Sequence, residues 1–160
     1  MKVIIDTREQ LPLPFKKGGL ITGIINEGLD VADYACEFED GHRPNIFFER
    51  KTIADLFGTM TSGYKRFKAE YERFAAIADE KKEFWLYTES TLLGVADGFH
   101  RSEFPGESMI KKLFTLLERY KINLLFMPDR AEAMEFMIQR WAAYGREYMS
   151  NKGMKNVRVA

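Results

Sequence analysis

The spacing of apolar residues changes part-way along the chain, and this change restricts the folds that the chain can form. In the first third, apolar and polar residues alternate with the period of a β-strand, most clearly over residues 31–39. After residue 52, apolar residues recur at helical spacing in longer segments, which short apolar runs separate. Strands first, and alternating helices and strands afterwards, predict an α/β fold with a central mixed β-sheet flanked by helices.

The same patterns give the elements that we expect. The expected strands are residues 2–5, 20–26, 31–39, 46–51, 84–87 and 122–127. The expected helices are residues 52–60, 63–81, 91–96, 108–120 and 131–149. Asp40-Gly41 indicates a hairpin turn between two of the strands. Thr52 and Asp55 have the spacing of a capping box, and Ser62 is the expected cap of the second helix.

Size and composition are those of a single globular domain. At 160 residues, with 46% hydrophobic and 30% charged residues, the chain can bury its own core. We expect residues 1–150 to form this domain and residues 151–160 to be a flexible tail. Cys36 is the only cysteine, so no internal disulfide can form, and we interpret it as a small core residue in a reducing compartment.

Charge and hydropathy argue against several kinds of partner. The 24 acidic and 24 basic residues give zero net charge, which argues against a wholly basic surface that coats nucleic acid. The first residues, MKVIIDTREQ, become charged too soon for a signal peptide, and no apolar run approaches the roughly 18 residues of a membrane span. We therefore expect a cytoplasmic protein with no membrane contact.

Three charged residues interrupt an apolar strand. Glu49, Arg50 and Lys51 directly follow the apolar residues 46–48, and burying unpaired charge is costly. Such an interruption is either a strand that has reached the surface or a functional site. Side chains two apart share a face of a strand, so Glu49 and Lys51 point one way and Arg50 the other. If the hairpin pairs the two strands, Asp33 lies near Glu49.

Two carboxylates and a lysine at one strand end suit phosphodiester hydrolysis. Carboxylate oxygens are hard ligands that Mg²⁺ and Mn²⁺ accept, with water and phosphate completing the octahedron. A bound ion lowers the pKa of its water and neutralises charge on a scissile phosphate, and a lysine can orient or deprotonate that water. Asp33 and Glu49 are therefore candidate metal ligands, Lys51 is a candidate catalytic amine, and the Arg50 carbonyl is a further candidate ligand.

Asp followed by Glu-x-Lys is the pattern of the PD-(D/E)xK nucleases, and longer strings extend it here. These strings are DTRE at 6–9, DVADYA at 30–35 and FERKTIADL at 48–56. In order and spacing they resemble the nuclease domain of the XPF (ERCC) family, whose hallmark is Gly-Asp, then Glu-Arg-Lys, three residues and Asp. By motif the resemblance covers residues 2–90, and Ala32 stands where the family prefers glycine.

This resemblance implies a fold and a set of site residues. The implied fold is restriction-endonuclease-like, a central mixed β-sheet flanked by helices. The implied catalytic residues are Asp33, Glu49, Lys51, Arg50, Asp55 and Asp6, of which the first two would bind the metal. The nucleic-acid-binding residues that we expect are Arg8, Arg50, Lys65 and Arg66.

The resemblance also implies an activity. We expect a divalent-metal-dependent DNA endonuclease that acts at branched, flap or junction DNA, with Mg²⁺ as its cofactor and Mn²⁺ as a substitute. The helix-hairpin-helix and helicase modules of larger members have no counterpart in the sequence, so we expect a standalone nuclease core. Family members pair through their nuclease domains, so we expect a homodimer, with the last helix around Trp141 as its candidate contact.

Other interpretations stay open at this point. The activity has two alternatives: a less selective nuclease of phage or mobile-element type, and a non-catalytic DNA-binding or dimerisation module. Asp55 also fits a simple helix cap, and residues 49–51 also fit a solvated strand end. Arg8 and Glu9 fit a surface ion pair, which contributes little stability. The basic residues of the second helix alternate with glutamates and fit solvated i,i+4 pairing.

Overall fold

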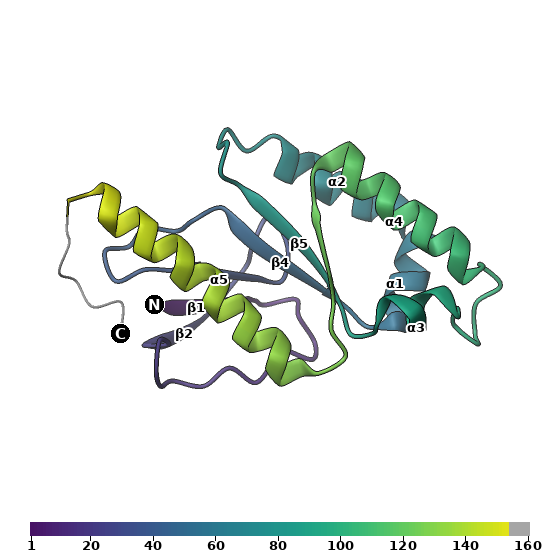
Figure 1. The fold of residues 1–160 in the computed structure, drawn as a ribbon, viewed down its shortest axis with the longest axis horizontal. Coiled ribbons are helices and arrows are strands. Elements are labelled where there is room, and N and C mark those ends of the chain that lie inside the picture. The colour runs from purple at the N-terminus through teal and green to yellow at the C-terminus, as the bar shows by residue number, and fades with distance from the viewer. Residues whose placement is uncertain (154–160) are drawn as a thin grey trace.

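A six-stranded β-sheet forms the centre of the computed structural model, which describes residues 1–153 (Figure 1). The strands are β1 (Lys2–Asp6), β2 (Gly23–Glu27), β3 (Tyr34–Glu37), β4 (Ile46–Lys51), β5 (Glu83–Thr88) and β6 (Asn123–Phe126). The helices are α1 (Ile53–Met60), α2 (Tyr64–Ala75), α3 (Leu92–Ala96), α4 (Gly106–Tyr120) and α5 (Arg130–Asn151).

The sheet is mixed, as predicted. Its order is β2-β1-β3-β4-β5-β6. β1 pairs parallel with β2 and antiparallel with β3, and β3 pairs antiparallel with β4. β4, β5 and β6 run parallel to one another. Parallel strands need long crossover connections, which α1 and α2 provide between β4 and β5, and α3 and α4 between β5 and β6. The hairpin turn is confirmed, since Gly41 has φ 80° and its N–H donates to the Phe38 carbonyl at 2.9 Å.

Helices cover both faces of the sheet, and each face encloses an apolar cluster (Figure 1). On one face, Leu56, Phe67 and Leu113 of α1, α2 and α4 pack against the strands. On the other face, Trp141 of α5 lies edge-on against Phe48 of β4, with ring centres 5.2 Å apart. The two clusters meet the sheet from opposite sides, so a side chain on β4 belongs to one face or the other.

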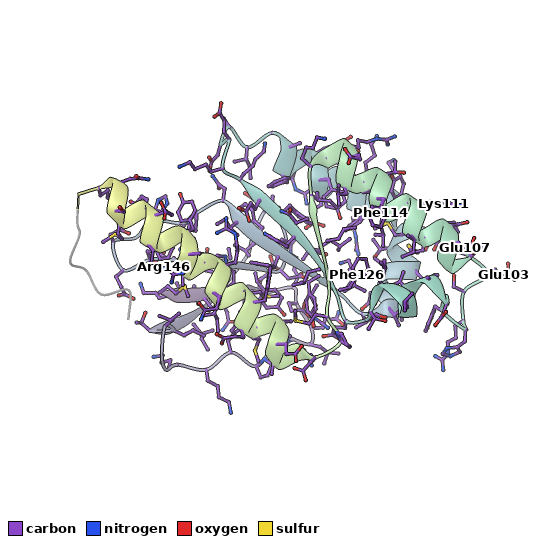
Figure 2. All side chains as sticks on the ribbon, viewed as in Figure 1. Glu103, Glu107, Lys111, Phe114, Phe126 and Arg146 are labelled. Atoms are coloured by element: carbon purple, nitrogen blue, oxygen red, sulfur yellow. The ribbon has the colours of Figure 1, made fainter. Side chains whose placement is uncertain are left out.

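The apolar side of α5 is used within the chain. Trp141 and Met137 are fully buried, and the Trp141 indole N–H donates to the Ile46 carbonyl at 3.0 Å. Trp141 and Met137 of the expected dimer contact therefore pack against the sheet of their own chain, and the homodimer stays a prediction. Large apolar side chains that remain exposed lie elsewhere, and Figure 2 shows one of them, Phe114, on the outer side of α4.

β3 begins at Tyr34 rather than at residue 31, and one residue accounts for the difference. Ala32 has φ 62°, in the left-handed region that strand residues do not adopt. Regular pairing therefore starts after this turn, and Asp33 lies just before the strand instead of inside it. The expected strand at 20–26 is likewise shifted, to Gly23–Glu27.

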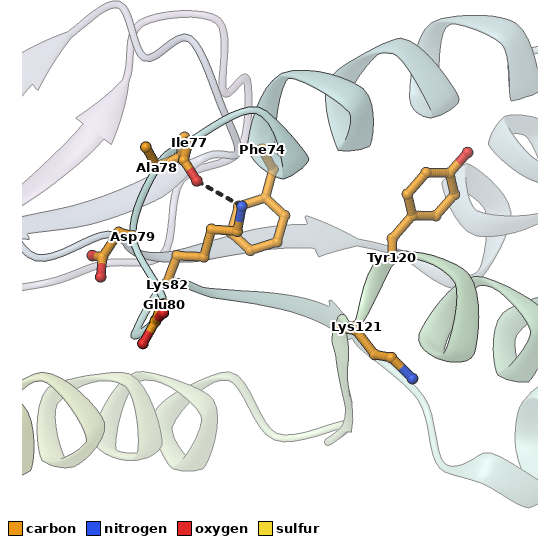
Figure 3. A pocket seen from close by; sticks show the side chains of 8 residues that line it. All are labelled: Phe74, Ile77, Ala78, Asp79, Glu80, Lys82, Tyr120 and Lys121. Carbon is orange, nitrogen blue, oxygen red and sulfur yellow. Dashed lines mark hydrogen bonds between the residues drawn. The ribbon is translucent and has the colours of Figure 1, made fainter.

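α2 ends at Ala75, well before the predicted end at residue 81. At this end the Lys82 amine donates to the carbonyl oxygens of Ala75 at 2.6 Å and Ile77 at 2.7 Å. These bonds satisfy backbone groups that the end of a helix leaves open. Figure 3 shows the Lys82 side chain folded back toward this turn.

The starts of two helices test the predicted caps. The cap of α1 is confirmed, because the Thr52 hydroxyl accepts the N–H of Asp55 at 3.1 Å. The cap predicted for α2 at Ser62 is wrong. Gly63 is the N-cap residue, and the Ser62 hydroxyl bonds back to the Gly58 carbonyl at 3.3 Å.

The end of the chain is described as far as residue 153. α5 continues to Asn151, and the tail predicted at 151–160 lies outside the described residues from 154 onward. Within the described part, no helix is both long enough and apolar enough to cross a membrane.

Candidate active site

Asp33 lies beside the segment of β4 that carries Glu49. Tyr34 pairs with Phe48 in the antiparallel β3–β4 ladder, so residue 33 comes opposite residue 49. The Asp33 carboxylate accepts the backbone N–H of Arg50 at 2.8 Å. The expected pairing of these strands is therefore confirmed, and it brings the two candidate metal ligands together.

Glu49 and Lys51 point to the face of the sheet that α1–α4 cover, where Phe47 also packs. Their side chains form an ion pair and are 6% and 15% exposed. The Lys51 amine also lies 5.8 Å from the centre of the Phe67 ring of α2. Burial of a paired lysine and glutamate excludes the simple interpretation of a solvated strand end for these two residues.

Burial and like charge disfavour ionisation of both carboxyl groups. Burial raises the pKa of Asp33 to about 6, although the Lys51 charge opposes the shift. Burial, and next the Asp33 charge, raises the pKa of Glu49 well above its ordinary value. Burial acts most strongly on Lys51 and disfavours its charged form, but the charge and hydrogen bond of Glu49, together with the charges of Asp33 and Glu70, outweigh burial and raise the pKa of the amine. Perturbed groups gathered at one place are typical of functional sites.

These side chains line a cavity of about 630 Å³. The N-terminal loop, the turn before β3, the end of β4 and α2 form its walls. Its lining residues are Arg8, Glu9, Gln10, Leu11, Ala32, Asp33, Glu49, Arg50, Lys51, Asp55, Arg66, Glu70 and Arg73. Of the residues that the sequence singled out, only Asp6 and Lys65 are absent from this lining. Lys65 is exposed near the start of α2.

One face of α2 brings Glu70 and Arg73 to the cavity, and the sequence did not single out either residue for a role there. Arg66, Glu70 and Arg73 are spaced by four and three residues and therefore share a side of the helix. Glu70 Oε1 accepts the N–H of Ala32 at 2.8 Å, and Arg73 donates to the Asp30 carbonyl at 2.9 Å. The helical spacing was visible in the sequence, but these partners across the fold were not.

Asp6 supports the site from behind its lining. Its carboxylate accepts two bonds from the Arg8 guanidinium, at 2.8 and 2.7 Å, and the N–H groups of Arg8 and Leu29 at 2.6 and 2.7 Å. The Asp6 N–H donates to the Asp33 carbonyl at 2.8 Å. These contacts fix the end of β1 next to a candidate ligand. The catalytic role of Asp6 and the DNA contact of Arg8 stay predictions.

Arg50 points to the opposite face of β4 and joins a buried ion-pair cluster. Its guanidinium contacts Glu9 and Glu89, each at 3.0 Å, and Arg130 at the start of α5 contacts Glu89 at 3.1 Å. The cluster ties together the N-terminal loop, β4, the end of β5 and α5. A direct role of Arg50 in chemistry or DNA binding stays a prediction.

Asp55 lies at the edge of the same cavity and also serves α1. Its carboxylate accepts the Thr52 hydroxyl at 2.6 Å, while its N–H donates to that same hydroxyl oxygen. The helix cap, which was the simpler interpretation of Asp55, is therefore present. A second role in the site stays a prediction.

The donor set fits a divalent cation. A half-buried and a buried carboxylate with raised pKa values, Asp33 and Glu49, repel one another, and a cation held between them would remove that repulsion. Within residues 1–153, no group of three or more His, Cys, Asp or Glu side chains is arranged to hold a metal ion. Mg²⁺ accepts one or two protein carboxylates, with water and phosphate oxygens at its other positions. Asp33 and Glu49 match this requirement by type and number.

A second hollow lies at the other end of α2 (Figure 3). Its volume is about 560 Å³. Its most enclosed cation, Lys82, is already bonded to helix-end carbonyls and lies 5.2 Å from the Phe74 ring. The Asp79 carboxylate in its wall accepts the Asn45 side chain at 2.9 Å. We therefore place the candidate site at the cavity around Asp33.

Comparison with solved structures decides the fold. XPF from Aeropyrum pernix matches with a TM-score of 0.62 at 18% identity, over 94% of this chain and 69% of that one. XPF from the same organism in complex with DNA matches with a TM-score of 0.61 at 19% identity, over 91% of this chain and 66% of that one. The chain has the XPF fold.

The XPF fold confirms the restriction-endonuclease-like architecture that the motifs implied. The chain spans about two thirds of the length of the XPF structures that it matches. A comparison with models of known families found no match, and neither did a comparison with curated protein sequences.

Proposed function

We propose that the protein is a divalent-metal-dependent DNA endonuclease. The observation that supports this proposal is the group of Asp33, Glu49 and Lys51, buried or half-buried at one cavity. Phosphodiester hydrolysis needs oxygen ligands for a metal and a positive group near the reacting phosphate, and these three side chains are of those types. The XPF fold supports the proposal, since one of the matching structures is in complex with DNA.

The roles in the reaction follow from the positions of the side chains. Asp33 and Glu49 would hold the cation, which when bound polarises the scissile phosphate and lowers the pKa of its water. Lys51 forms an ion pair with Glu49. With the Glu49 carboxylate held as a metal ligand, the Lys51 amine would orient the attacking water or stabilise charge on the phosphate oxygens.

Positive charge on α2 would position the DNA. Arg66 and Arg73 line the cavity on the same side of the helix, Arg8 lines it from the N-terminal loop, and Lys65 precedes Arg66 in α2. Contacts from such side chains to phosphates fix the register of DNA without reading its sequence. Because the net charge of the chain is zero, we expect binding to depend on this local patch.

The preferred substrate that we propose is DNA with a branch, flap or single-strand/duplex junction. The support for this preference is the motif resemblance to the XPF nuclease domain. On the same basis we propose Mg²⁺ as the working ion, Mn²⁺ as its substitute and a homodimer as the working assembly.

A panel of substrates tests the proposed function. Purified protein is given splayed arms, flaps, four-way junctions, plain duplex and single strands with Mg²⁺, with Mn²⁺ and with EDTA. We expect metal-dependent cuts near the branch points, and no cuts in EDTA. In Asp33→Asn and Glu49→Gln, cleavage is lost while DNA binding in a gel-shift assay is retained.

Other results of the panel separate the alternatives. Equal cleavage of branched and plain DNA indicates a less selective nuclease with the same site. Binding of DNA without cleavage of any substrate, under both metals, indicates a non-catalytic module. Cleavage that is equal in the wild type and in both variants contradicts the assignment of the site.

A further inference from the structure

The residue before the candidate ligand Asp33 has an unfavourable backbone conformation. Ala32 has φ 62° and is almost completely buried. This left-handed conformation is disfavoured for every residue other than glycine, and it persists only where neighbouring contacts hold it. The turn at Ala32 sets the direction in which the chain enters β3, and therefore where Asp33 lies beside β4.

Glu70 supplies a contact that holds this turn. Its Oε1 accepts the N–H of Ala32 at 2.8 Å, across 38 positions of the sequence. A carboxylate that accepts a backbone N–H makes one of the stronger hydrogen bonds in proteins. Among the described residues, Glu70 forms no salt bridge with the basic side chains of its own helix. Its carboxylate is therefore directed to the turn rather than to Arg66 or Arg73.

Glu70 is also part of the electrostatics of the site. It lines the same cavity as Asp33 and Glu49. Its negative charge adds to the causes that raise the pKa of both carboxyl groups. The charge of Glu70 and its hydrogen bond to Ala32 are therefore two separable properties of this side chain.

We propose that Glu70 is a positioning residue for the metal site: by holding the N–H of Ala32, it fixes the left-handed turn that places the Asp33 carboxylate beside Glu49. This inference rests on the proposed function. Glu70 acts through the backbone of Ala32 and is not itself a ligand. The property that matters is its hydrogen-bond acceptor, not its charge.

Two substitutions of Glu70 separate the acceptor from the charge. Glu70→Gln keeps an oxygen that accepts the Ala32 N–H, and Glu70→Met removes it at similar length. We expect the Mn²⁺ dissociation constant, measured by electron paramagnetic resonance, to stay within threefold of wild type in the first variant. In the second variant we expect it to rise at least tenfold, while the KM for DNA is unchanged. Glu72→Gln, which removes an exposed carboxylate of the same helix, is the control and leaves both values unchanged.

A rescue variant tests the turn itself. Glycine adopts positive φ freely, so Ala32→Gly makes the turn less dependent on its contact with Glu70. We expect Ala32→Gly combined with Glu70→Met to recover most of the lost Mn²⁺ affinity. Amide hydrogen exchange gives a readout without metal or DNA, with exchange at Ala32 at least tenfold faster in Glu70→Met and unchanged in Glu70→Gln.

The outcomes distinguish this inference from the proposed function. Wild-type Mn²⁺ affinity in Glu70→Met overturns the positioning role and leaves the proposed function intact. Equal weakening in Glu70→Gln and Glu70→Met shows that the charge acts, which also overturns it. A wild-type protein that neither binds Mn²⁺ nor cuts DNA overturns the proposed function and the positioning role with it.

Discussion

The candidate site consists of charged side chains at positions where burial disfavours their charged forms. Glu49 and Lys51 are both largely buried and neutralise one another across an ion pair. Asp33 adds a second carboxyl whose pKa burial raises to about 6. Such a group is costly to maintain for stability alone, because burial disfavours each charge and the pairing recovers only part of that cost. A function for these residues explains the cost.

The first prediction concerns Lys51. Lys51→Met keeps a long side chain but removes the amine that would assist the attacking water. We expect the cleavage rate to fall about 10²- to 10⁴-fold, the range for loss of an acid–base group. Affinity for Mn²⁺ should be at least that of wild type, because the lysine no longer competes for the Glu49 carboxylate. Lys68→Met, at an exposed position of α2, is the matched control.

Single-turnover cleavage and a Mn²⁺ titration of the Lys51→Met protein check this prediction together. A rate within tenfold of wild type, or a parallel loss of metal affinity, would contradict the catalytic role of the amine.

The sequence predicted Asp33, Glu49 and Lys51 because the period of a strand fixes which side chains share a face. It did not predict the cavity role of Glu70, whose partner Ala32 is 38 positions away and is contacted through its backbone. The sequence also could not predict the ion pair of Arg50 with Glu89, because this pair forms only when β5 lies next to β4. Local periodicity therefore identified the candidate ligands, and tertiary pairing supplied their surroundings.

Among the secondary-structure elements, α2 and α5 cover opposite faces of the sheet, and α2 also lines the cavity. α2 turns one polar side to the cavity and its apolar side to the core. α5 covers the other face and comes close to the turn after β3 (Figure 1). Periodicity predicted the types of the elements but not their ends. β3 starts late because of the turn at Ala32, and α2 ends at Ala75, whose carbonyl accepts the Lys82 amine.

The second prediction compares two glycines inside helices. A methyl group at Gly58 of α1 would meet nothing within 4 Å, whereas one at Gly145 of α5 would lie 2.9 Å from the Phe38 ring. We expect Gly58→Ala to stabilise the protein by about 0.5–1 kcal/mol through helix propensity. We expect Gly145→Ala to destabilise it by about 1–2 kcal/mol, because the overlap exceeds the gain in propensity.

Urea unfolding of the two glycine variants gives the comparison, since both carry the same chemical change. Equal stabilities for Gly58→Ala and Gly145→Ala would show that α5 does not pack against the β3 turn as closely as described.

On the scale of the whole molecule, the sheet separates two layers with different tasks. The Glu49–Lys51 pair lies on the side of α1–α4, whereas the Arg50 ion-pair cluster extends to Arg130 of α5 and borders the cavity through Arg50 and Glu9. The fold class was predictable from strands followed by alternating elements. The strand order was not, because β1 lies between β2 and β3 and no local pattern encodes that insertion.

The third prediction concerns the acid stability of the whole molecule. Burial of Asp6 works against its charge, but the hydrogen bonds from Arg8 and Leu29 outweigh this and lower its pKa below the ordinary 3.8. A carboxyl with a lowered pKa in the folded state stabilises that state above its unfolded pKa, and this stability is lost as the pH falls through the folded value. We expect Asp6→Asn to cost about 1–3 kcal/mol near neutral pH.

The difference between Asp6→Asn and wild type should shrink as the pH falls below 3.8. Urea unfolding at neutral and at acid pH measures it. A gap of the same size at both pH values would show that the Asp6 charge does not contribute.

The most direct test of the proposed site is Mn²⁺ binding by the wild type, Asp33→Asn and Glu49→Gln, followed by electron paramagnetic resonance. We expect the wild type to bind the ion and each variant to lose at least tenfold in affinity, because in the proposed site both carboxylates would contact the same cation. Wild-type affinity in both variants would contradict a metal site shared between the turn before β3 and the end of β4.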